Sequence, residues 1–216
     1  MEDKVVIKDQ TFEKLKPIKE RFENKNNKFS AQGYYKDKKV KIYEVFDKNQ
    51  GSLREFVSKH EQLSLYFPNL VLYDEKYIVE EWLSGKTLRE TISNNLIDSE
   101  YVKELKKIIK LMWSINYNEK TFDYIDYIYK RLNKTNSFDL SKIPIRINHN
   151  DLSLDNILVS SEGLKIIDNE FLGCSTGWVL NYKNSFLSEE LINQDYISNE
   201  ILNELWKIRK EWSLYR

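Results

Sequence analysis

The chain is poor in the residues that form disulfides, glycine-rich loops and membrane spans. It has a single cysteine, Cys174, which excludes an intrachain disulfide and indicates a reducing compartment. Only six glycines and three prolines occur, and no stretch matches Gly-x-Gly-x-x-Gly. Because no long apolar run is present, we predict neither a signal peptide nor a transmembrane segment, and we expect a cytoplasmic protein.

Charge of one sign is not in excess either. The 216 residues include 34 basic and 34 acidic side chains, so no overall field favours nucleic acid as a partner. A hydrophobic share of 41% and a charged share of 31% are typical of a folded, helix-rich protein. This length suits one compact domain or two small lobes, and it says nothing about the oligomeric state.

Two short apolar runs late in the chain predict a β-hairpin. Residues 157–159 and 164–167 flank a Ser-Ser-Glu-Gly segment, which has the composition of a turn. Antiparallel pairing would place Asn156, before the first strand, and Asp168, after the second, at the same open end. Asp151, in the preceding loop, can reach that end. We therefore expect these three side chains to converge.

An amide oxygen and two carboxylates at one point suit the binding of a magnesium nucleotide. Mg²⁺ prefers oxygen ligands and usually takes only one or two from the protein, the others coming from water and phosphate. Asn156 and Asp168 would supply those two ligands. Asp151 would remain to orient a substrate hydroxyl and accept its proton.

The same residues carry a resemblance to a known family. His149-x-Asp151, then Asn156, a strand, a turn and Ile167-Asp168-x-Glu170 resemble the catalytic segment of the kinase-like phosphotransferases, which include aminoglycoside phosphotransferases and choline or ethanolamine kinases. The likeness to protein kinases is more distant, because their Asp-Phe-Gly triplet is Asp-Asn-Glu here. The resemblance implies that His149 and Glu170 are structural braces.

The resemblance implies an α+β fold with two lobes, similar to that of protein kinases. Residues 1–82 would form a nucleotide-binding lobe around a small antiparallel sheet. Residues 83–216 would form a reduced, helical catalytic lobe. Few residues follow Asp168, so we expect no long activation segment.

Further residues are assigned by position in the resembled fold. The second strand of a pair at 29–35 and 40–46 would carry the lysine that binds the α- and β-phosphates, which is Lys41, with Lys39 as the alternative. The next helix, predicted over residues 53–66, would supply a glutamate that pairs with this lysine. Glu55 has the better spacing for that role, and Glu61 is the alternative.

The segment between the lobes would contact the nucleotide base. A hairpin predicted from residues 70–73 and 77–82 leads into it, and Glu81 and Leu83 would meet the base through their backbones. A short turn around residues 24–29 would cover the phosphates. Helical spacing predicts further helices over residues 12–22, 87–93, 98–116, 121–132 and 195–214, and Thr87 with Glu90 has the spacing of a capping box.

Together these features predict an ATP- and Mg²⁺-dependent kinase whose acceptor is a hydroxyl. The acceptor would be a small molecule or a saccharide, such as a surface-glycan sugar, an amino alcohol or an aminoglycoside. Two alternatives stay open: a protein kinase with a specific protein partner, and a pseudokinase that binds nucleotide without turnover. The choice between ATP and GTP is also open.

Overall fold

The chain forms two compact units. The computed structural model describes residues 4–18, 28–92, 97–181 and 197–215. The first unit comprises residues 1–91 with 153–170, and the second comprises residues 92–152 with 171–216. This division differs from the single cut predicted after Trp82. The late hairpin joins the first unit because its strand β9 (Ile157–Ser160) pairs with β7 (Lys86–Thr87).

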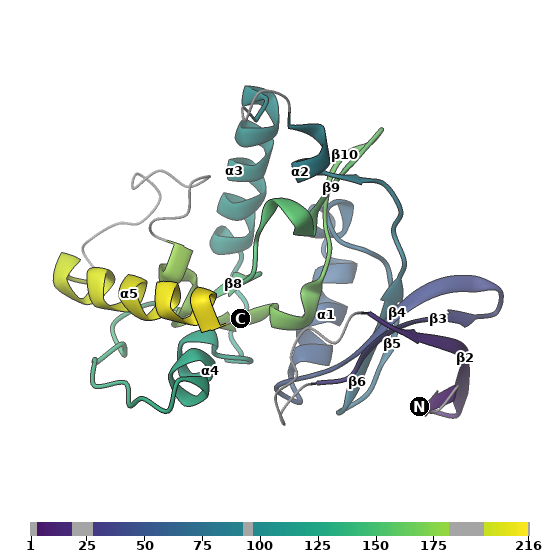
Figure 1. Cartoon of the computed structure of the whole chain (residues 1–216), viewed down its shortest axis with the longest axis horizontal. Helices are drawn as coiled ribbons and strands as arrows, with labels where there is room; N and C mark the ends of the chain where they lie inside the picture. Colours follow the sequence, from purple (N-terminus) through teal and green to yellow (C-terminus); the bar gives the residue numbers. More distant parts are fainter. Residues whose placement is uncertain (1–3, 19–27, 93–96, 182–196, 216) are drawn as a thin grey trace. The chain divides into compact units, whose positions relative to one another are not determined.

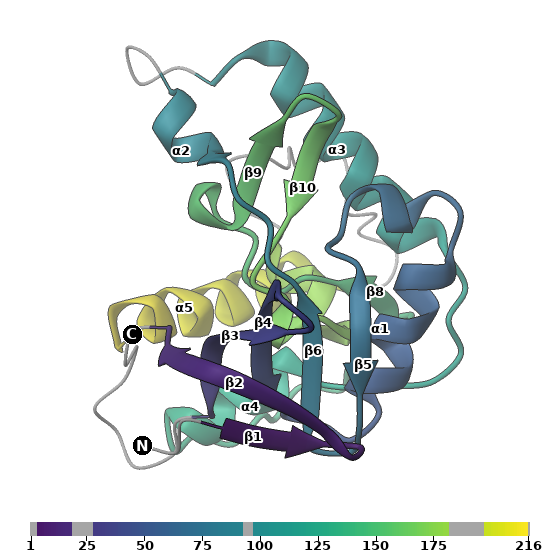
Figure 2. The same cartoon turned by 90° about the vertical axis from the view of Figure 1, so that its right-hand side faces the viewer.

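An antiparallel sheet forms the body of the first unit (Figure 2). Within the described residues its strands, in spatial order, are β1 (Lys4–Ile7), β2 (Gln10–Pro17), β3 (Ser30–Tyr35), β4 (Lys38–Glu44), β6 (Tyr77–Glu81) and β5 (Leu70–Tyr73). The strand pair predicted at 29–35 and 40–46 and the later predicted hairpin are both confirmed.

Side chains of β4 alternate between the two faces of this sheet. Val40 and Ile42 lie in a core cluster with residues of β1, β2 and β6. Tyr43 belongs to a second cluster, where it packs with Ile78. Because successive side chains of a strand point to opposite faces, Lys41 shares the face of Tyr43.

The helix predicted over residues 12–22 is wrong, because β2 occupies most of that stretch. Phe12 and Leu15 are three positions apart, which is the spacing of one helix face. In the strand, an irregular register around Lys14, whose φ is 52°, interrupts the alternation. Both apolar side chains therefore pack onto the same core cluster. The end of the predicted helix, residues 19–22, lies outside the described residues.

The helix predicted over residues 53–66 forms as α1 (Gln50–Lys59), followed by the 3₁₀ helix η1 (Leu63–Leu65). Helix α1 lies beside β5 (Figure 2). Its buried face includes the charged residue Arg54 beside Val57. A buried arginine needs a partner, which here is Glu80 of β6.

The predicted late hairpin is confirmed. Strands β9 and β10 (Gly163–Ile166) pair antiparallel, and the 3₁₀ helix η2 (Leu154–Asn156) precedes them. On its other side β9 pairs with β7, which leads into the short helix α2 (Leu88–Thr91). The capping box at the start of α2 is present: the N–H of Glu90 donates to Thr87 Oγ1 at 3.3 Å, and the N–H of Thr87 donates to Glu90 Oε2 at 2.7 Å.

Helices dominate the second unit (Figure 1). Its described elements are α3 (Ser99–Ser114), α4 (Tyr124–Arg131), α5 (Asn199–Tyr215), the 3₁₀ helix η4 (Thr176–Asn181) and the antiparallel pair β8 (Arg146–Asn148) and β11 (Gly173–Ser175). These helices match the predictions over 98–116, 121–132 and 195–214, although residues 195 and 196 lie outside the described part. Asp98 caps α3 by accepting from the N–H of Glu100 at 2.8 Å.

Aromatic side chains form much of the interior of the second unit. Trp113 and Trp178 pack with their ring centroids 5.1 Å apart. Helices α4 and α5 contact each other, and Tyr127 meets Trp212 edge to face at 5.6 Å. Indole and phenol rings bury a large apolar area each. They share the core of this unit with aliphatic side chains such as Leu105 and Ile128.

The predicted α+β class, with a small antiparallel sheet in one compact unit and a reduced set of helices in the other, is confirmed. Within the part of the chain that the structure describes, none of the helices combines the length and the apolar character that a membrane crossing requires.

Candidate active site

The hairpin brings Asn156 and Asp168 to one place in the first unit. The N–H of Ile167 donates to the carbonyl of Asn156 at 2.9 Å, which closes the open end of the hairpin. Asn156 is buried, and Asp168 follows with a φ of 64°, a left-handed conformation that aspartate tolerates better than most residues. Both residues line one pocket.

Lys41 extends from β4 into the same pocket. Its ammonium group forms ion pairs with the carboxylates of Asp168 and Glu170, the latter at 3.0 Å. Burial alone would lower the pKa of Lys41, but the carboxylates of Glu170 and Asp168 outweigh that cost and hold the pKa well above its ordinary value. The lysine is therefore a permanent cation at working pH.

The alternative lysine points to a different partner. Lys39 Nζ lies 4.2 Å from the centroid of the Trp82 ring, which is the geometry of a cation–π contact. Lys39 is half-buried and does not line the pocket, whereas Lys41 does. Of the two candidates, the structure thus brings Lys41 to Asp168.

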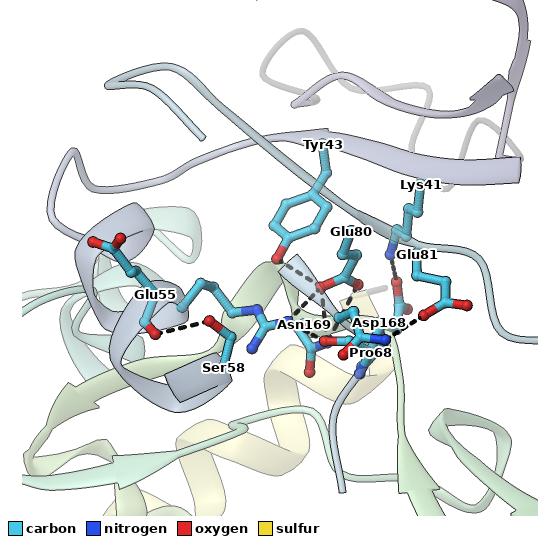
Figure 3. A network of polar contacts seen from close by, with 11 residues as sticks. Lys41, Tyr43, Glu55, Ser58, Pro68, Glu80, Glu81, Asp168 and Asn169 are labelled. Atoms are coloured by element: carbon cyan, nitrogen blue, oxygen red, sulfur yellow. Dashed lines mark hydrogen bonds and ion pairs between the residues drawn. The ribbon is translucent and has the colours of Figure 1, made fainter. Parts of the chain in front are cut away.

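The predicted ion pair between Lys41 and Glu55 does not form in the structure. Glu55 accepts from Lys59 at 2.7 Å and from the hydroxyl of Tyr73 at 2.8 Å, on the exposed side of α1. Figure 3 shows its carboxylate pointing away from Lys41. The alternative, Glu61, is exposed in the turn after α1. Neither glutamate contacts Lys41, because the buried face of α1 carries Arg54 and not Glu55.

Glu80 is an acidic residue of the site that no motif in the sequence indicates. It lies on β6 directly across the sheet from Lys41. Its Oε2 accepts from Arg54 Nη2 and from Asn169 Nδ2, both at 3.1 Å, and from the hydroxyl of Tyr43 at 3.4 Å (Figure 3). Arg54 and Glu80 are each 1% exposed.

Two more residues hold the Asp-Asn-Glu triplet from its other end. Ser30 Oγ donates to Glu170 Oε1 at 2.7 Å, and Gln50 Nε2 donates to the carbonyl of Glu170 at 3.0 Å. Burial of Gln50 follows from helical spacing, since Gln50, Arg54 and Val57 lie on one face of α1. The same spacing places Arg54 on the buried face of α1, which was not predicted from the sequence.

The pocket itself lies within the first unit. Glu81, at the end of β6, and Leu83, in the segment that follows, both line the pocket. These are the two residues that were predicted to meet the nucleotide base. The described lining of the pocket is Ile18, Lys41, Pro68, Glu80, Glu81, Trp82, Leu83, Asp155, Asn156, Ile167 and Asp168. Asp155 also binds Arg89 at 2.7 Å. The turn predicted around residues 24–29 to cover phosphates falls mostly outside the described residues.

Asp151 belongs to the second unit, in the loop after β8. It is 8% exposed, and Arg209 Nη2 of α5 lies 3.8 Å from its Oδ1. Asn150, at a φ of 65°, fixes this loop by donating to the carbonyl of Phe171 at 2.8 Å, and His149 is fully buried. Convergence of Asp151 with Asn156 and Asp168 stays a prediction, because these side chains are in different units.

The donor set of the first unit fits one Mg²⁺ ion held with a nucleotide. Among the described residues, no group of three or more His, Cys, Asp or Glu side chains is placed to hold a metal ion. Asn156 and Asp168 offer one amide and one carboxylate, the small protein share that Mg²⁺ takes when phosphates supply the remainder. Around them, the carboxylates of Glu80, Asp168 and Glu170 outnumber the cations of Lys41 and Arg54.

Comparison with known proteins yields a sequence relative and similarities in fold. No known protein-family model matches the chain. An uncharacterized protein from Metamycoplasma hominis is 29% identical over 120 residues, which span 52% of this chain and 22% of that protein. The chain thus covers about a fifth of the length of this relative.

Solved structures similar in fold include a thermostable mutant of aminoglycoside phosphotransferase APH(4)-Ia, with a TM-score of 0.48 and 11% identity over 79% of this chain and 72% of that one. A ternary complex of the same phosphotransferase with ADP and hygromycin B has a TM-score of 0.46 and 10% identity, covering 79% and 71%. A choline kinase from Cryptosporidium parvum has a TM-score of 0.48 and 15% identity, covering 95% and 74%. At these identities the likeness concerns the fold alone.

Proposed function

We propose that the chain is an ATP- and Mg²⁺-dependent phosphotransferase that moves the γ-phosphoryl group to a hydroxyl of a small molecule or a saccharide. One observation carries this proposal: a permanent cation, Lys41, and two oxygen donors, Asn156 and Asp168, line the same pocket. Phosphoryl transfer requires positioning and charge neutralisation more than covalent chemistry from the protein, so this small set of groups suffices.

The nucleotide base would lie against the segment from Glu81 to Leu83. The N–H of Glu81 donates to the carbonyl of Asn69 at 2.9 Å, and the N–H of Trp82 donates to the carbonyl of Lys39 at 3.1 Å. Both donors are thus used inside the sheet. The proposed contacts to the base edge are therefore the carbonyl of Glu81 and the N–H of Leu83.

The phosphates would meet Lys41, which pairs with Asp168 and Glu170 in the ligand-free protein. Asn156 and Asp168 would hold Mg²⁺, which when bound supplies neutralisation of the phosphate charge. The ammonium group of Lys41 would then bind the α- and β-phosphates. Since Glu170 is held by Ser30 and Gln50, the triplet keeps its place when Lys41 changes partner.

Asp151 is assigned the role of base from its place in the sequence motif. It would accept the proton of the acceptor hydroxyl while that oxygen bonds to the γ-phosphorus and the bond to the β-phosphate oxygen breaks. The loop around Asp151 is held by buried amides, as Asn148 Nδ2 donates to Asn150 Oδ1 at 2.6 Å. A loop fixed in this way helps to keep the carboxylate of Asp151 oriented.

A small acceptor is favoured over a protein. After Asp168 the chain passes through the 3₁₀ helix η3 (Asn169–Phe171) and enters β11 at Gly173. No extended segment lies between them, although protein kinases carry their activation loop after the corresponding aspartate. A sugar, an amino alcohol or an aminoglycoside hydroxyl needs no such docking segment.

The experiment that tests the proposal follows labelled phosphate from ATP into two isolated fractions, metabolites and proteins, by mass spectrometry. We expect the metabolite or saccharide fraction to gain the label, and Asp151→Asn to lower the rate by about 10²–10⁴-fold. Asp126→Asn is the matched control, since Asp126 is an exposed aspartate of α4 in the same unit and belongs to neither the motif nor the pocket.

Three other results of this experiment would contradict the proposed function. Label in the protein fraction would establish the protein-kinase alternative. Equal rates for the native chain and Asp151→Asn would reject the assigned chemistry, and binding of Mg²⁺·ADP without any turnover would identify a pseudokinase.

A further inference from the structure

A buried polar network ties α1, β6 and the Asp-Asn-Glu triplet together. Arg54 donates to Glu80 at 3.1 Å and to the carbonyl of Pro68 at 3.0 Å. Asn169 donates through Nδ2 to both oxygens of Glu80, at 3.2 Å and 3.1 Å. The three side chains are each 1% exposed. Asn169 directly follows Asp168, so the network ends one residue from the proposed metal ligand.

The network is poorly explained by stability alone. Arg54 Nε, Arg54 Nη1 and Asn169 Oδ1 are buried without a hydrogen-bond partner in the described structure. Taking two charges out of water is costly, and apolar side chains of similar volume often replace a buried ion pair without loss of stability. The network buries charge and leaves donors unused, so stability is not its main effect. Its structure indicates instead that the residues it joins must be held in fixed positions.

We propose that Glu80, fixed by Arg54, is the positioning residue that holds Asp168 and Glu170 in place through Asn169. A glutamate of α1 was predicted to pair with Lys41; in the structure α1 instead supplies Arg54, and the glutamate that it pairs with comes from β6. The catalytic consequence of the positioning role rests on the function proposed above, whereas the positioning itself is a property of the ligand-free protein.

The backbone explains why the triplet needs such a support. Asp168 has a φ of 64°, a conformation that is unfavourable for residues other than glycine, even though aspartate tolerates it better than most, and that persists where its surroundings impose it. Glu80 imposes it from one side through Asn169, and Ser30 and Gln50 hold Glu170 from the other. Loss of the Glu80 contact would leave one side unsupported.

The decisive variant is Asn169→Ala, which cuts the contact and leaves the ion pair of Arg54 and Glu80 intact. Backbone amide order parameters of residues 168–170 in the ligand-free protein should fall from about 0.85 toward about 0.6. The Mg²⁺ concentration needed for half-maximal ADP binding should rise about 10–100-fold, the usual effect of losing a residue that orients a metal ligand. Arg54→Met, which releases Glu80 without altering a pocket residue, should give a shift in the same direction.

Val79→Ala is the matched control. Val79 is fully buried next to Glu80 on β6 but points to the opposite face, into the core cluster. Its truncation should destabilise the first unit while leaving the order parameters of residues 168–170 and the Mg²⁺ requirement unchanged. A thermal unfolding scan of every variant identifies any that fails to fold.

The two proposals fail in different ways. Unchanged order parameters in Asn169→Ala overturn the positioning role, whatever the activity of the native chain. If the native chain binds no Mg²⁺·ADP while Asn169→Ala loses order at residues 168–170, the proposed function fails and the positioning role stands. If the Mg²⁺ requirement rises equally in Val79→Ala, a general loss of stability explains the effect and the positioning role is rejected.

Discussion

The two units bury their largest side chains for different purposes. Among the described residues, Trp178 and Trp212 are the largest fully buried side chains of the second unit, whereas Arg54 is the largest of the first. The indole N–H of Trp178 donates to the carbonyl of Pro144 at 2.7 Å, and that of Trp212 donates to the hydroxyl of Tyr124 at 3.1 Å. Arg54 leaves two of its nitrogens without a partner.

This difference separates packing from positioning. In the second unit each buried tryptophan adds apolar contact and has its polar atom satisfied, so every part of the side chain contributes to stability. In the first unit a charged network crosses from helix to strand to hairpin beside the pocket. Substitutions in the second unit should therefore act by leaving a cavity in the core. Substitutions in the network of the first unit should act by releasing the residues beside the pocket from their positions.

The largest effect is expected for Asp168→Asn in the first unit. Loss of the carboxylate removes one metal ligand and one partner of Lys41, and metal stabilisation of charge is worth several kcal/mol. The rate of ATP consumption should fall about 10³-fold. Asp37→Asn is the control, because Asp37 has a nearly equal φ of 61° but lies exposed in the turn between β3 and β4. Equal rates in both variants would refute the assignment of Asp168.

Trp212→Ala should produce the largest loss of stability in the second unit. It empties a fully buried site and removes the contact with Tyr127, so the free energy of unfolding should fall by about 3–5 kcal/mol. Trp206→Ala, on the same helix and only half-buried, should cost clearly less. Denaturant unfolding of both variants measures the difference, and comparable losses would contradict the packing role.

Cys174 gives a smaller, pH-dependent effect. Burial raises the pKa of this thiol from 9.0 to about 11. Between these pH values the unfolded chain releases the thiol proton while the folded chain retains it. The contribution of the buried thiol to the free energy of unfolding is therefore fully present below about pH 9 and is lost as the pH rises toward 11. The stability advantage of the native chain over Cys174→Ala should shrink by on the order of 1–2 kcal/mol between pH 8 and 11. If the difference in the free energy of unfolding between the native chain and Cys174→Ala stays constant from pH 8 to 11, the raised pKa of Cys174 is contradicted.

The smallest effect is expected for Glu55→Gln. Glu55 binds Lys59 and Tyr73 at the surface of α1, and exposed ion pairs of this kind have little measurable influence. Turnover should be unchanged, in contrast to Arg54→Met one residue earlier on the same helix. A large loss in Glu55→Gln would restore the original prediction that this glutamate serves Lys41.

Local chemistry made much of the fold predictable. The late hairpin follows from two apolar runs around a turn, and the start of α2 follows from Thr87 and Glu90 at capping-box spacing. The helix predicted over residues 12–22 is a strand, β2: Phe12 and Leu15 have the sequence spacing of a helix face, and the bulge at Lys14 lets both side chains reach the same core from an extended chain. A register irregularity of this kind depends on the neighbouring strand and leaves no local signal.

The candidate site was predictable only in part, because some of its contacts depend on the pairing of strands that are distant in sequence. The motif identified Asn156 and Asp168, which the hairpin brings together by short-range pairing. The pairing of Arg54 with Glu80 joins residues that are distant in sequence, and two neighbouring glutamates, Glu80 and Glu81, end the same strand. Strand alternation decides which of them faces the buried side, and that depends on the register with β4.

The contact between Lys39 and Trp82 gives the protein an optical reporter of its own. Trp82 lines the pocket, and it is the one tryptophan among the five in the chain that does so in the described structure. An ammonium group over an indole ring perturbs its emission, and a nucleotide base entering the pocket would change both this contact and the hydration of the ring. Titration followed by intrinsic fluorescence, with Trp82→Phe as the silent reference, would thus reveal pocket occupancy without any label.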